Sequence, residues 1–291
     1  MNTKEKNIKD TVGNTPLIEV DGIYAKLETT NPTGSIKDRM VKHLMEVAEK
    51  NSELKKGSKI IEVTSGNTGI SLAMFSAIKG YHFTAVMPES MSIERRKMMK
   101  HFGAEIILTP AKEDMEGAIR EYNKLIKANP DAWLPSQFEN KENIIAHEIG
   151  LGREIEKDMD GKINTFVAGA GTGGTLIGVA NHLKKINPNI KIIAVEPEES
   201  AVLSGEKAGL HKIQGIGEGF IPKILKENLN LIDSVITINS DDAISAKEEL
   251  AQKYGILVGT SSGANFLAAQ MIKKGKVVTV FPDRGERYLS E

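Results

Sequence analysis

The architecture of this chain is set by Thr165-Phe166-Val167-Ala168-Gly169-Ala170-Gly171-Thr172-Gly173-Gly174-Thr175, an apolar run that leads into a glycine-rich turn. The apolar residues predict a buried strand, and residues 176–186 continue with the spacing of a helix. Glycines let a backbone approach a phosphate closely, and the N–H groups of a helix start point toward it. The turn therefore fits a phosphate cradle or an ordinary strand-to-helix connection, and alone it does not decide between them.

A dinucleotide-binding fingerprint is a second interpretation of this turn. Gly169-Ala170-Gly171-Thr172-Gly173-Gly174 comes close to GxGxxG without matching its spacing. That fingerprint also expects an acidic residue at the end of a following strand, and Glu196 in Val195-Glu196-Pro197 is the nearest candidate. The nucleotide interpretation therefore stays open at this point.

The same order of strand, loop and helix occurs earlier in the chain. Lys59-Ile60-Ile61-Glu62-Val63 predicts a buried strand, and Thr64-Ser65-Gly66-Asn67-Thr68-Gly69 follows it before a helix. Hydroxyls, an amide and the N–H groups of a helix start suit an anion such as an amino-acid carboxylate. Ser, Thr and Asn are also ordinary helix caps, but this collection exceeds what a cap needs.

Strands and helices alternate along nearly the whole chain, which predicts parallel sheets covered by helices on both faces. Further strands are expected at 24–27, 83–86, 105–108, 191–195, 234–238, 256–258 and 277–281, and further helices at 69–79, 92–102, 115–128, 144–157, 242–254 and 264–274. We expect an α/β fold of two doubly wound, mostly parallel sheets flanked by helices, with the ligand beyond the carboxyl ends of the strands in a cleft between two domains. Residues 198–230 are less regular and predict an excursion over that cleft.

Composition and charge exclude several classes of protein. Lys and Arg number 38 and Asp and Glu 39, so the net charge is close to zero and gives no argument for nucleic acid or a membrane surface as partner. No apolar run is long enough to span a bilayer, and the polar start of the chain lacks a signal peptide, so we expect a cytoplasmic protein. The absence of cysteine excludes disulfides and thiolate chemistry, and the six histidines lack paired ligand spacing, so we expect no metal.

One lysine lies in a loop whose position gives it a possible chemical use. Asn31-Pro32-Thr33-Gly34-Ser35-Ile36-Lys37-Asp38-Arg39 connects the strand expected at 24–27 with a helix beginning near Asp38. Taken alone, Lys37 is an exposed lysine in a salt bridge. Beside a phosphate loop, its amine can form a Schiff base with an aldehyde cofactor. Asp38 and Arg39 are expected to form structural ion pairs.

Together these motifs resemble the cysteine synthase family, which comprises the O-acetylserine sulfhydrylase and cystathionine β-synthase group of fold-type II pyridoxal-phosphate enzymes. The loops around Lys37, Thr64 and Gly171 are joined by Gly13-Asn14-Thr15-Pro16-Leu17, Met87-Pro88-Glu89-Ser90-Met91-Ser92-Ile93-Glu94-Arg95-Arg96, Lys212-Ile213-Gln214-Gly215-Ile216-Gly217, Ser261-Ser262-Gly263-Ala264 and Asp283-Arg284-Gly285-Glu286-Arg287-Tyr288-Leu289. Order and approximate spacing hold across almost the whole chain. Each motif alone is weak, whereas the ordered set is specific.

The resemblance implies pyridoxal 5'-phosphate as cofactor and a role for each motif. The cofactor contacts it implies are Lys37 as Schiff base, Asn67 at the ring hydroxyl, Gly171, Thr172, Gly173, Gly174 and Thr175 at the phosphate, and Ser261 at the pyridine nitrogen. The substrate contacts it implies are Thr64, Ser65, Gly66, Thr68 and Gln137 at the carboxylate, with Gly217 and Glu218 on the substrate side. It also implies a smaller mobile domain, 36–146, that carries the carboxylate loop, and a larger phosphate-binding domain of 1–35 with 147–291.

The reaction that the resemblance implies is β-replacement on an L-amino acid through an α-aminoacrylate, with Lys37 as the base that takes the Cα proton. The first choice is O-acetyl-L-serine and sulfide giving L-cysteine. In the alternative, L-cysteine is the donor, hydrogen sulfide leaves, and a thiol amino acid or water gives lanthionine, cystathionine or serine. A homodimer is expected from the family, and a serine acetyltransferase remains open as a partner.

Two departures from the family's pattern bear on that choice. Sulfhydrylases commonly have Ala where this chain has Glu218, in Gly215-Ile216-Gly217-Glu218-Gly219-Phe220. A carboxylate there repels hydrosulfide and can receive the ammonium group of a second amino acid, unless it simply faces solvent. In addition, Gly150-Leu151 replaces a pair of threonines, which puts local hydrogen bonding in doubt.

Two other functions compete with β-replacement. Dehydratases of this fold type usually show a different lysine context and a run of glycines at the phosphate. A binding protein that keeps the fold would be favoured by loss of Lys37 or Asn67, and both are present. A visible absorbance band that shifts on adding O-acetylserine or cysteine distinguishes an enzyme from such a binding module.

Overall fold

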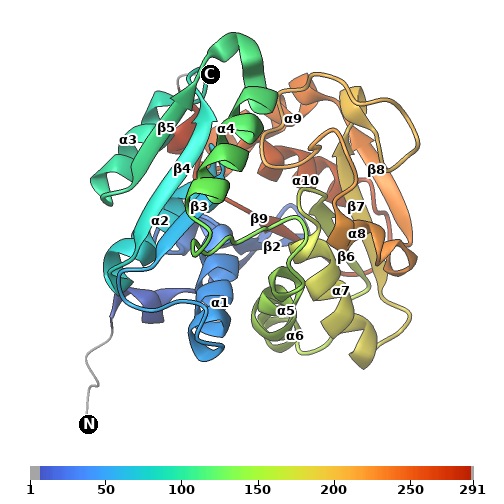
Figure 1. Cartoon of the computed structure of the whole chain (residues 1–291). Coiled ribbons are helices and arrows are strands. Elements are labelled where there is room, and N and C mark those ends of the chain that lie inside the picture. The colour runs from blue at the N-terminus through green and yellow to red at the C-terminus, as the bar shows by residue number, and fades with distance from the viewer. Residues whose placement is uncertain (1–6, 290–291) are drawn as a thin grey trace. The chain divides into compact units, whose positions relative to one another are not determined.

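A computed structural model describes residues 7–289 of the chain (Figure 1). The described residues form two compact units, one of residues 7–10 with Lys37–Ser136 and the other of Thr11–Ile36 with 137–289. Each unit contains one sheet with helices on both of its faces. The expected α/β fold with parallel sheets flanked by helices is therefore confirmed. The mobility of one domain stays a prediction.

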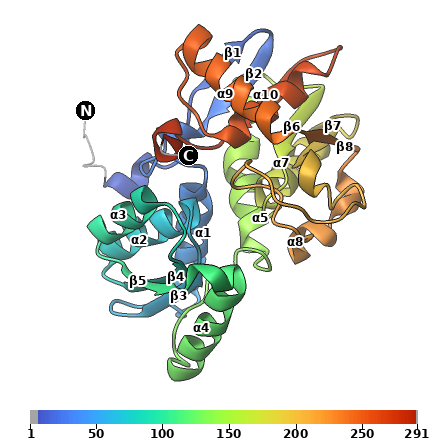
Figure 2. The same cartoon turned by 90° about the horizontal axis from the view of Figure 1, so that it is seen from above.

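The first unit is built on three parallel strands in the order β3, β4 and β5. Their bounds are Lys59–Val63, His82–Pro88 and Glu105–Thr109, and the helices are α1 (Lys37–Lys50), α2 (Asn67–Lys79), α3 (Ile93–His101) and α4 (Asp114–Ala128). Helices α2 and α3 cover one face of the sheet and α4 the other, while α1 packs beside α2 (Figure 2).

Local sequence explains these elements. Ile61 of β3 packs with Val86 and Ala118 on the α4 side, whereas its neighbour Ile60 points to the opposite face, as strand alternation requires. The side-chain oxygen of Ser92, the expected cap, accepts a hydrogen bond from the N–H of Arg95 at 3.5 Å.

The second unit has six strands in the order β1, β2, β9, β6, β7 and β8. Their bounds are Leu17–Val20, Ile23–Leu27, Val277–Phe281, Thr165–Gly169, Lys191–Pro197 and Ser234–Ile238. All neighbours are parallel except β1 and β2, which form an antiparallel hairpin. The α-helices are α5 (Glu142–His147), α6 (Arg153–Asp158), α7 (Gly174–Ile186), α8 (Lys223–Lys226), α9 (Ser240–Tyr254) and α10 (Thr260–Gln270).

The core of this unit lies on both faces of β6. Phe166 and Ala168 pack in a cluster with residues of α7, and Val167 packs in a second cluster with residues of α10. All three side chains are at most 1% exposed. A strand covered on both faces reads as a continuous apolar run, which is why β6 is visible in the sequence.

The predicted helix at 144–157 is not continuous. It is divided into α5 and α6 by a π-helical turn at Glu148–Gly152. A Cβ built on Gly152 would lie 2.7 Å from Cβ of His182 in α7, so the turn packs tightly against that helix. Gly150 and Gly152 are poor helix formers, and they permit the wider turn.

Two further predictions were wrong in detail. Residues 256–258 are not a strand, because they run between α9 and α10 and Val258 makes a single antiparallel bridge to Arg284. Helix α10 lies at Thr260–Gln270 instead of 264–274. Residues 198–230 are irregular as expected, with the short 3₁₀ helices η5 (Glu198–Ser200) and η6 (Leu229–Leu231) and the one-turn α8.

The remaining 3₁₀ helices are η1 (Ile8–Thr11), η2 (Glu28–Thr30), η3 (Ala111–Glu113) and η7 (Gly285–Tyr288).

Candidate active site

The glycine-rich turn lies between the carboxyl end of β6 and the start of α7. Gly173 caps α7 in the left-handed conformation, with φ of 91°. Thr172 Oγ1 accepts hydrogen bonds from Asn143 Nδ2 at 3.0 Å and from the N–H of Gly174 at 3.3 Å. Because Gly173 has no side chain, other N–H groups of the first turn of α7 are left to a ligand or to water.

Glycine is required in this turn for reasons of space. A Cβ built on Gly171 would lie 2.4 Å from the backbone oxygen of Gly215, and one built on Gly174 would lie 1.9 Å from Asn143 Oδ1. Real Cβ atoms do not come that close, so neither position accepts another residue without a shift. A glycine backbone without side chains at the start of a 13-residue helix fits a phosphate group.

Helix α10 brings the predicted residue Ser261 to the same unit. Ser261 lies in the first turn of α10 and is 4% exposed. In the part of the chain that the structure describes, Ser262 Oγ and Asn265 Oδ1 are buried without a hydrogen-bond partner. Asn265 Oδ1 is 3.4 Å from a Cβ built on Gly169, so α10 lies beside the glycine-rich turn. Buried polar atoms of this kind fit a bound polar group such as pyridoxal phosphate.

The loop at Gly215–Gly217 lies directly against the glycine-rich turn. The N–H of Gly217 donates to the backbone oxygen of Ala170 at 3.1 Å, and a Cβ built on Gly169 would lie 2.5 Å from Ile216 Cγ2. Glu218, the next residue, is exposed. The structure therefore brings the predicted substrate loop next to the predicted phosphate loop.

Gln137 is connected to the same turn through Asn143. The backbone oxygen of Gln137 accepts a hydrogen bond from Asn143 Nδ2 at 2.9 Å, and that amide also donates to Thr172. Gln137 is 6% exposed. Asn143 was missed by sequence reasoning, since it lies in a polar segment with no motif and only its contacts reveal its position.

In the other unit, the predicted carboxylate loop joins the carboxyl end of β3 to α2. Thr64 Oγ1 accepts from the N–H of Gly69 at 3.2 Å, and the N–H of Thr64 donates to the oxygen of Val86 at 3.2 Å. Thr64 and Thr68 are buried, whereas Ser65, Gly66 and Asn67 are half-buried. Asn67 is the first residue of α2, so the loop presents hydroxyls and an amide at a helix start.

Lys37 is the first residue of α1 and is half-buried. Asp38, for which an ion pair was expected, is fully buried and accepts a short hydrogen bond from Ser71 Oγ of α2. This contact fixes the start of α1 to α2 within the first unit.

The residues that precede Lys37 in the chain belong to the second unit, where they are firmly held. The N–H of Ile36 donates to the oxygen of Pro282 at 2.8 Å, at the carboxyl end of β9. A Cβ built on Gly34 would lie 2.8 Å from Arg284 Cδ, and Arg287 Nη2 donates to the oxygen of Thr33 at 2.5 Å. Lys37 therefore follows a segment with a fixed backbone.

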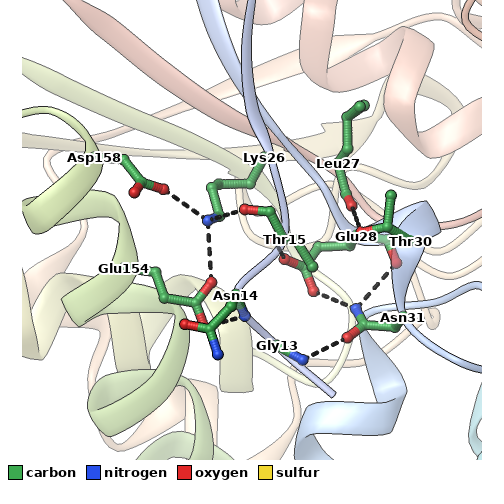
Figure 3. A network of polar contacts seen from close by, with 10 residues as sticks. All are labelled: Gly13, Asn14, Thr15, Lys26, Leu27, Glu28, Thr30, Asn31, Glu154 and Asp158. Atoms are coloured by element: carbon green, nitrogen blue, oxygen red, sulfur yellow. Dashed lines mark hydrogen bonds and ion pairs between the residues drawn. The ribbon is translucent and has the colours of Figure 1, made fainter. Parts of the chain in front are cut away.

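Further back, a buried carboxylate holds the start of this segment (Figure 3). Glu28 is fully buried and accepts hydrogen bonds from Thr15 Oγ1 and Asn31 Nδ2, both at 2.7 Å. Asn31 Oδ1 accepts from the N–H of Gly13 at 2.9 Å. The motif around Gly13 and the motif around Lys37 are thus parts of one network.

Comparison with known proteins assigns this chain to a family. The family model described as "Pyridoxal-phosphate dependent enzyme" matches residues 8–283. The chain belongs to the pyridoxal-phosphate-dependent enzyme family. Cysteine synthase from Staphylococcus aureus is 47% identical over 298 residues, which cover 98% of this chain and 95% of that protein.

Solved structures of this enzyme family are similar over nearly the whole chain. A cysteine synthase from Entamoeba histolytica has a TM-score of 0.94 at 45% identity, covering 99% of this chain and 90% of that one. A hydrogen sulfide-producing enzyme from Fusobacterium nucleatum has a TM-score of 0.93 at 41% identity, covering 99% of both chains. The resemblance to the cysteine synthase family and the expectation of pyridoxal phosphate as cofactor are confirmed.

The part of the chain that the structure describes contains neither a candidate metal site nor a candidate membrane-spanning helix. Within residues 7–289, no group of three or more His, Cys, Asp or Glu side chains is arranged to hold a metal ion. Over the same residues, no helix is both long enough and apolar enough to cross a membrane.

Proposed function

We propose that this enzyme makes L-cysteine and acetate from O-acetyl-L-serine and sulfide. The similarity to cysteine synthases along the full length of the chain is the observation that carries the proposal. Two strand-to-helix loops that suit anions, one for a phosphate and one for a carboxylate, support it.

Residues of the second unit provide most of the proposed contacts with the cofactor. Gly171, Thr172, Gly173, Gly174 and Thr175 hold the phosphate with backbone N–H groups and hydroxyls. Ser261 would contact the pyridine nitrogen, and Asn67 of the first unit would bind the ring hydroxyl. When bound, pyridoxal phosphate supplies an electron sink for charge that develops at Cα of the amino acid.

Lys37 has two roles in this proposal. In the resting enzyme its Nζ holds the cofactor covalently. With the amino acid bound, the free Nζ would accept the proton from Cα as the acetate group leaves from Cβ. Sulfide then adds at Cβ, and Lys37 returns the proton to Cα. The fixed backbone before Lys37, from Thr33 to Ile36, restricts the point from which the Lys37 side chain extends, which supports a positioned amine.

The carboxylate loop orients the amino acid for that proton transfer. Thr64, Ser65, Gly66 and Thr68 donate to the substrate carboxylate at the start of α2, and Gln137 adds its amide. Gly217 and Glu218 contact the substrate side. We extend the proposal to a movement of the domain at 36–146 when the carboxylate binds, because the chain passes between the two units next to Lys37 and next to Gln137.

The proposal is tested by measuring L-cysteine formed from O-acetyl-L-serine and sulfide. Replacing Lys37 by Ala removes the base and should lower the rate at least about 10³-fold. The control is Lys253→Ala, an exposed lysine that pairs with Glu249 on α9, and it should leave the rate unchanged. A Lys37→Ala enzyme that retains a tenth of the activity would contradict the assignment.

A second donor is favoured by one residue and one relative. Glu218 is a carboxylate on the loop next to the phosphate turn, and the relative from Fusobacterium nucleatum is a hydrogen sulfide-producing enzyme. In this alternative L-cysteine loses hydrosulfide from Cβ, and a thiol amino acid or water adds in its place. Sulfide released rapidly from L-cysteine alone would favour this reaction, and an unchanged acceptor profile in Glu218→Ala would show that Glu218 takes no part.

We also propose a cytoplasmic homodimer. Family resemblance supports the dimer and leaves a serine acetyltransferase open as partner. Light scattering of the purified enzyme, alone and mixed with an acetyltransferase, measures both.

A further inference from the structure

Asn143, in helix α5, packs against the phosphate turn at 171–175 and is 1% exposed. Its Nδ2 donates two hydrogen bonds, one to the backbone oxygen of Gln137 at 2.9 Å and one to Thr172 Oγ1 at 3.0 Å. On the other side of the amide, a Cβ built on Gly174 would lie 1.9 Å from Oδ1. The side chain therefore touches both the backbone of Gln137 and the phosphate turn.

The backbone oxygen of Gln137 decides which way round the amide of Asn143 lies. A carbonyl oxygen accepts hydrogen bonds and cannot donate one, so the amide atom that faces it is the nitrogen. Exchanging Nδ2 and Oδ1 would set two oxygens against each other and would remove the donor from Thr172 Oγ1 as well. The amide of Asn143 is thus a donor toward Thr172.

That orientation leaves the oxygen of the amide unpaired. Among residues 7–289, Asn143 Oδ1 is buried and has no hydrogen-bond partner. A buried oxygen without a donor lowers the stability of a protein. The amide at this position therefore serves the two oxygens that accept from it, and is not placed to complete its own hydrogen bonds.

The hydroxyl of Thr172 has both of its acceptor positions filled. Its Oγ1 accepts from Asn143 Nδ2 at 3.0 Å and from the N–H of Gly174 at 3.3 Å. A hydroxyl accepts at two lone pairs and donates one hydrogen, so the hydrogen of Thr172 points away from both donors. Thr172 is half-buried and lies just before the start of α7, where N–H groups favour an anion. The hydroxyl hydrogen is therefore available to an anionic ligand at that helix start.

We propose that Asn143 is a positioning residue that makes the Thr172 hydroxyl a hydrogen-bond donor to the phosphate of pyridoxal phosphate. The inference rests on the proposed function, because it takes the turn at 171–175 as the phosphate site. Without the amide of Asn143, one lone pair of Thr172 Oγ1 has no donor. The hydroxyl can then rotate away from the phosphate, and part of its hydrogen bond to the ligand is lost.

The test compares the affinities of the cofactor-free, full-length protein for pyridoxal phosphate and for pyridoxal, which lacks the phosphate, by absorbance titration. The ratio of the two affinities isolates the phosphate contacts, because both ligands carry the same aldehyde. Asn143→Ala should lower the ratio about fivefold, the effect of losing one hydrogen bond, and Thr172→Val about tenfold, because its bond is to a charged group. The double variant should fall no further than Thr172→Val alone, since Asn143 acts through that hydroxyl.

The ratio separates positioning from a purely structural role, which would lower both affinities together and leave the ratio unchanged. An unchanged ratio in Asn143→Ala, or a fall of about fiftyfold in the double variant, the product of the two single effects, would overturn the inference.

A second variant, Asn143→Asp, keeps the shape of the side chain if the alanine variant does not fold. Its ratio should fall at least about fivefold, because a carboxylate cannot donate to Thr172, and an unchanged ratio here would also overturn the inference. The matched control is Asn189→Asp, which adds the same charge at an exposed position between α7 and β7 and should give the wild-type ratio.

The formation of L-cysteine is measured separately, so the two proposals fail in different ways. If the wild type makes no L-cysteine from O-acetyl-L-serine and sulfide but the variants show the expected ratios, the role of Asn143 holds and the proposed reaction fails. If Thr172→Val keeps the wild-type ratio, Thr172 does not bind the phosphate and the inference fails, whether or not L-cysteine is formed.

Discussion

At the scale of single residues, the candidate site depends on positions where a Cβ cannot exist. Gly171 and Gly174 bring backbone so close to Gly215 and Asn143 that any side chain would overlap them. The phosphate turn is therefore shaped by the neighbours that its glycines admit, as well as by its own hydroxyls. The glycines and hydroxyls of the turn are visible in the sequence, whereas these neighbours are seen only in the structure.

Gly171→Ala should weaken cofactor binding about tenfold or more, because the new Cβ must displace the loop at Gly215. The measurement is a titration of the cofactor-free protein with pyridoxal phosphate, followed by absorbance. Lys253→Ala, the exposed lysine on α9, is the control, and it should bind the cofactor like the wild type. Equal affinities of the two variants would show that the turn adapts and that its shape is not critical.

Residues that reach the turn from elsewhere in the chain escaped prediction. Asn143 and His211 touch the phosphate turn and the loop beside it, yet each stands in a polar segment without periodicity or motif. Asn143 is 29 residues from Thr172 in the sequence, a separation that a local pattern does not encode, whereas His211 contacts Gly217 only six residues further along, in a segment without periodicity.

At the scale of elements, Asp233 holds three of them together. It lies just before β8, accepts from Lys184 of α7 at 2.8 Å and from Lys191 of β7 at 2.9 Å, and accepts the N–H of Ile192 at 3.0 Å. Burial alone would raise the pKa of Asp233, but these donors outweigh it and lower the pKa from 3.8 to about 2. The charged carboxylate is therefore the form that stabilises the fold.

Asp233→Asn should lower the free energy of unfolding by about 1 kcal/mol at about pH 7, a value that allows for solvent screening. A depressed folded-state pKa contributes stability above the unfolded value, and that contribution is lost as the pH falls toward about 2. The difference between wild type and variant should therefore halve near about pH 3. Urea unfolding across this range measures it.

The control for this prediction is an exposed pair. Glu249→Gln on α9 breaks a contact with Lys253 in which both side chains are about half exposed, and it should leave the unfolding midpoint unchanged. A difference between wild type and Asp233→Asn that stays constant from neutral to acid pH would contradict the role of the charge.

Elements with a single strong pattern were predicted well, and those with mixed signals were not. Buried parallel strands such as β6 are recognised in the sequence as apolar runs, and Ser92 marks the start of α3. The π-helical turn at Glu148–Gly152 was missed because it depends on contact with α7. The run at 256–258 has the composition of a strand, but its place in the chain is between two helices.

At the scale of the whole molecule, the order of the strands in each sheet could not be predicted from the sequence. Strand β9 lies between β2 and β6, so the last strand of the chain pairs with one of its first. Alternation predicts that the strands are parallel, whereas their order depends on pairings across more than 100 residues. The polar network of Figure 3 adds to this long-range connection of the second unit.

Lys26 is the centre of that connection, and it is 1% exposed. Its Nζ contacts the oxygen of Thr15 at 2.6 Å, Asp158 at 2.9 Å and Glu154 at 3.0 Å, and Glu154 also accepts the N–H of Asn14 at 2.8 Å. The lysine thereby ties β2 and the loop before β1 to α6. Such a buried cation is stable only with all of its partners in place.

Lys26→Met should therefore lower the free energy of unfolding by about 3 kcal/mol, because Glu154 and Asp158 keep their charges without the cation between them. Chemical denaturation of the cofactor-loaded enzyme measures the loss. The double variant Lys26→Met with Glu154→Gln should recover about 1 kcal/mol, since one of the two uncompensated charges is gone. If the double variant is less stable than the single one, repulsion between the carboxylates is not the cause. A single variant within about 0.5 kcal/mol of the wild type would show that the network contributes little to the stability of this unit.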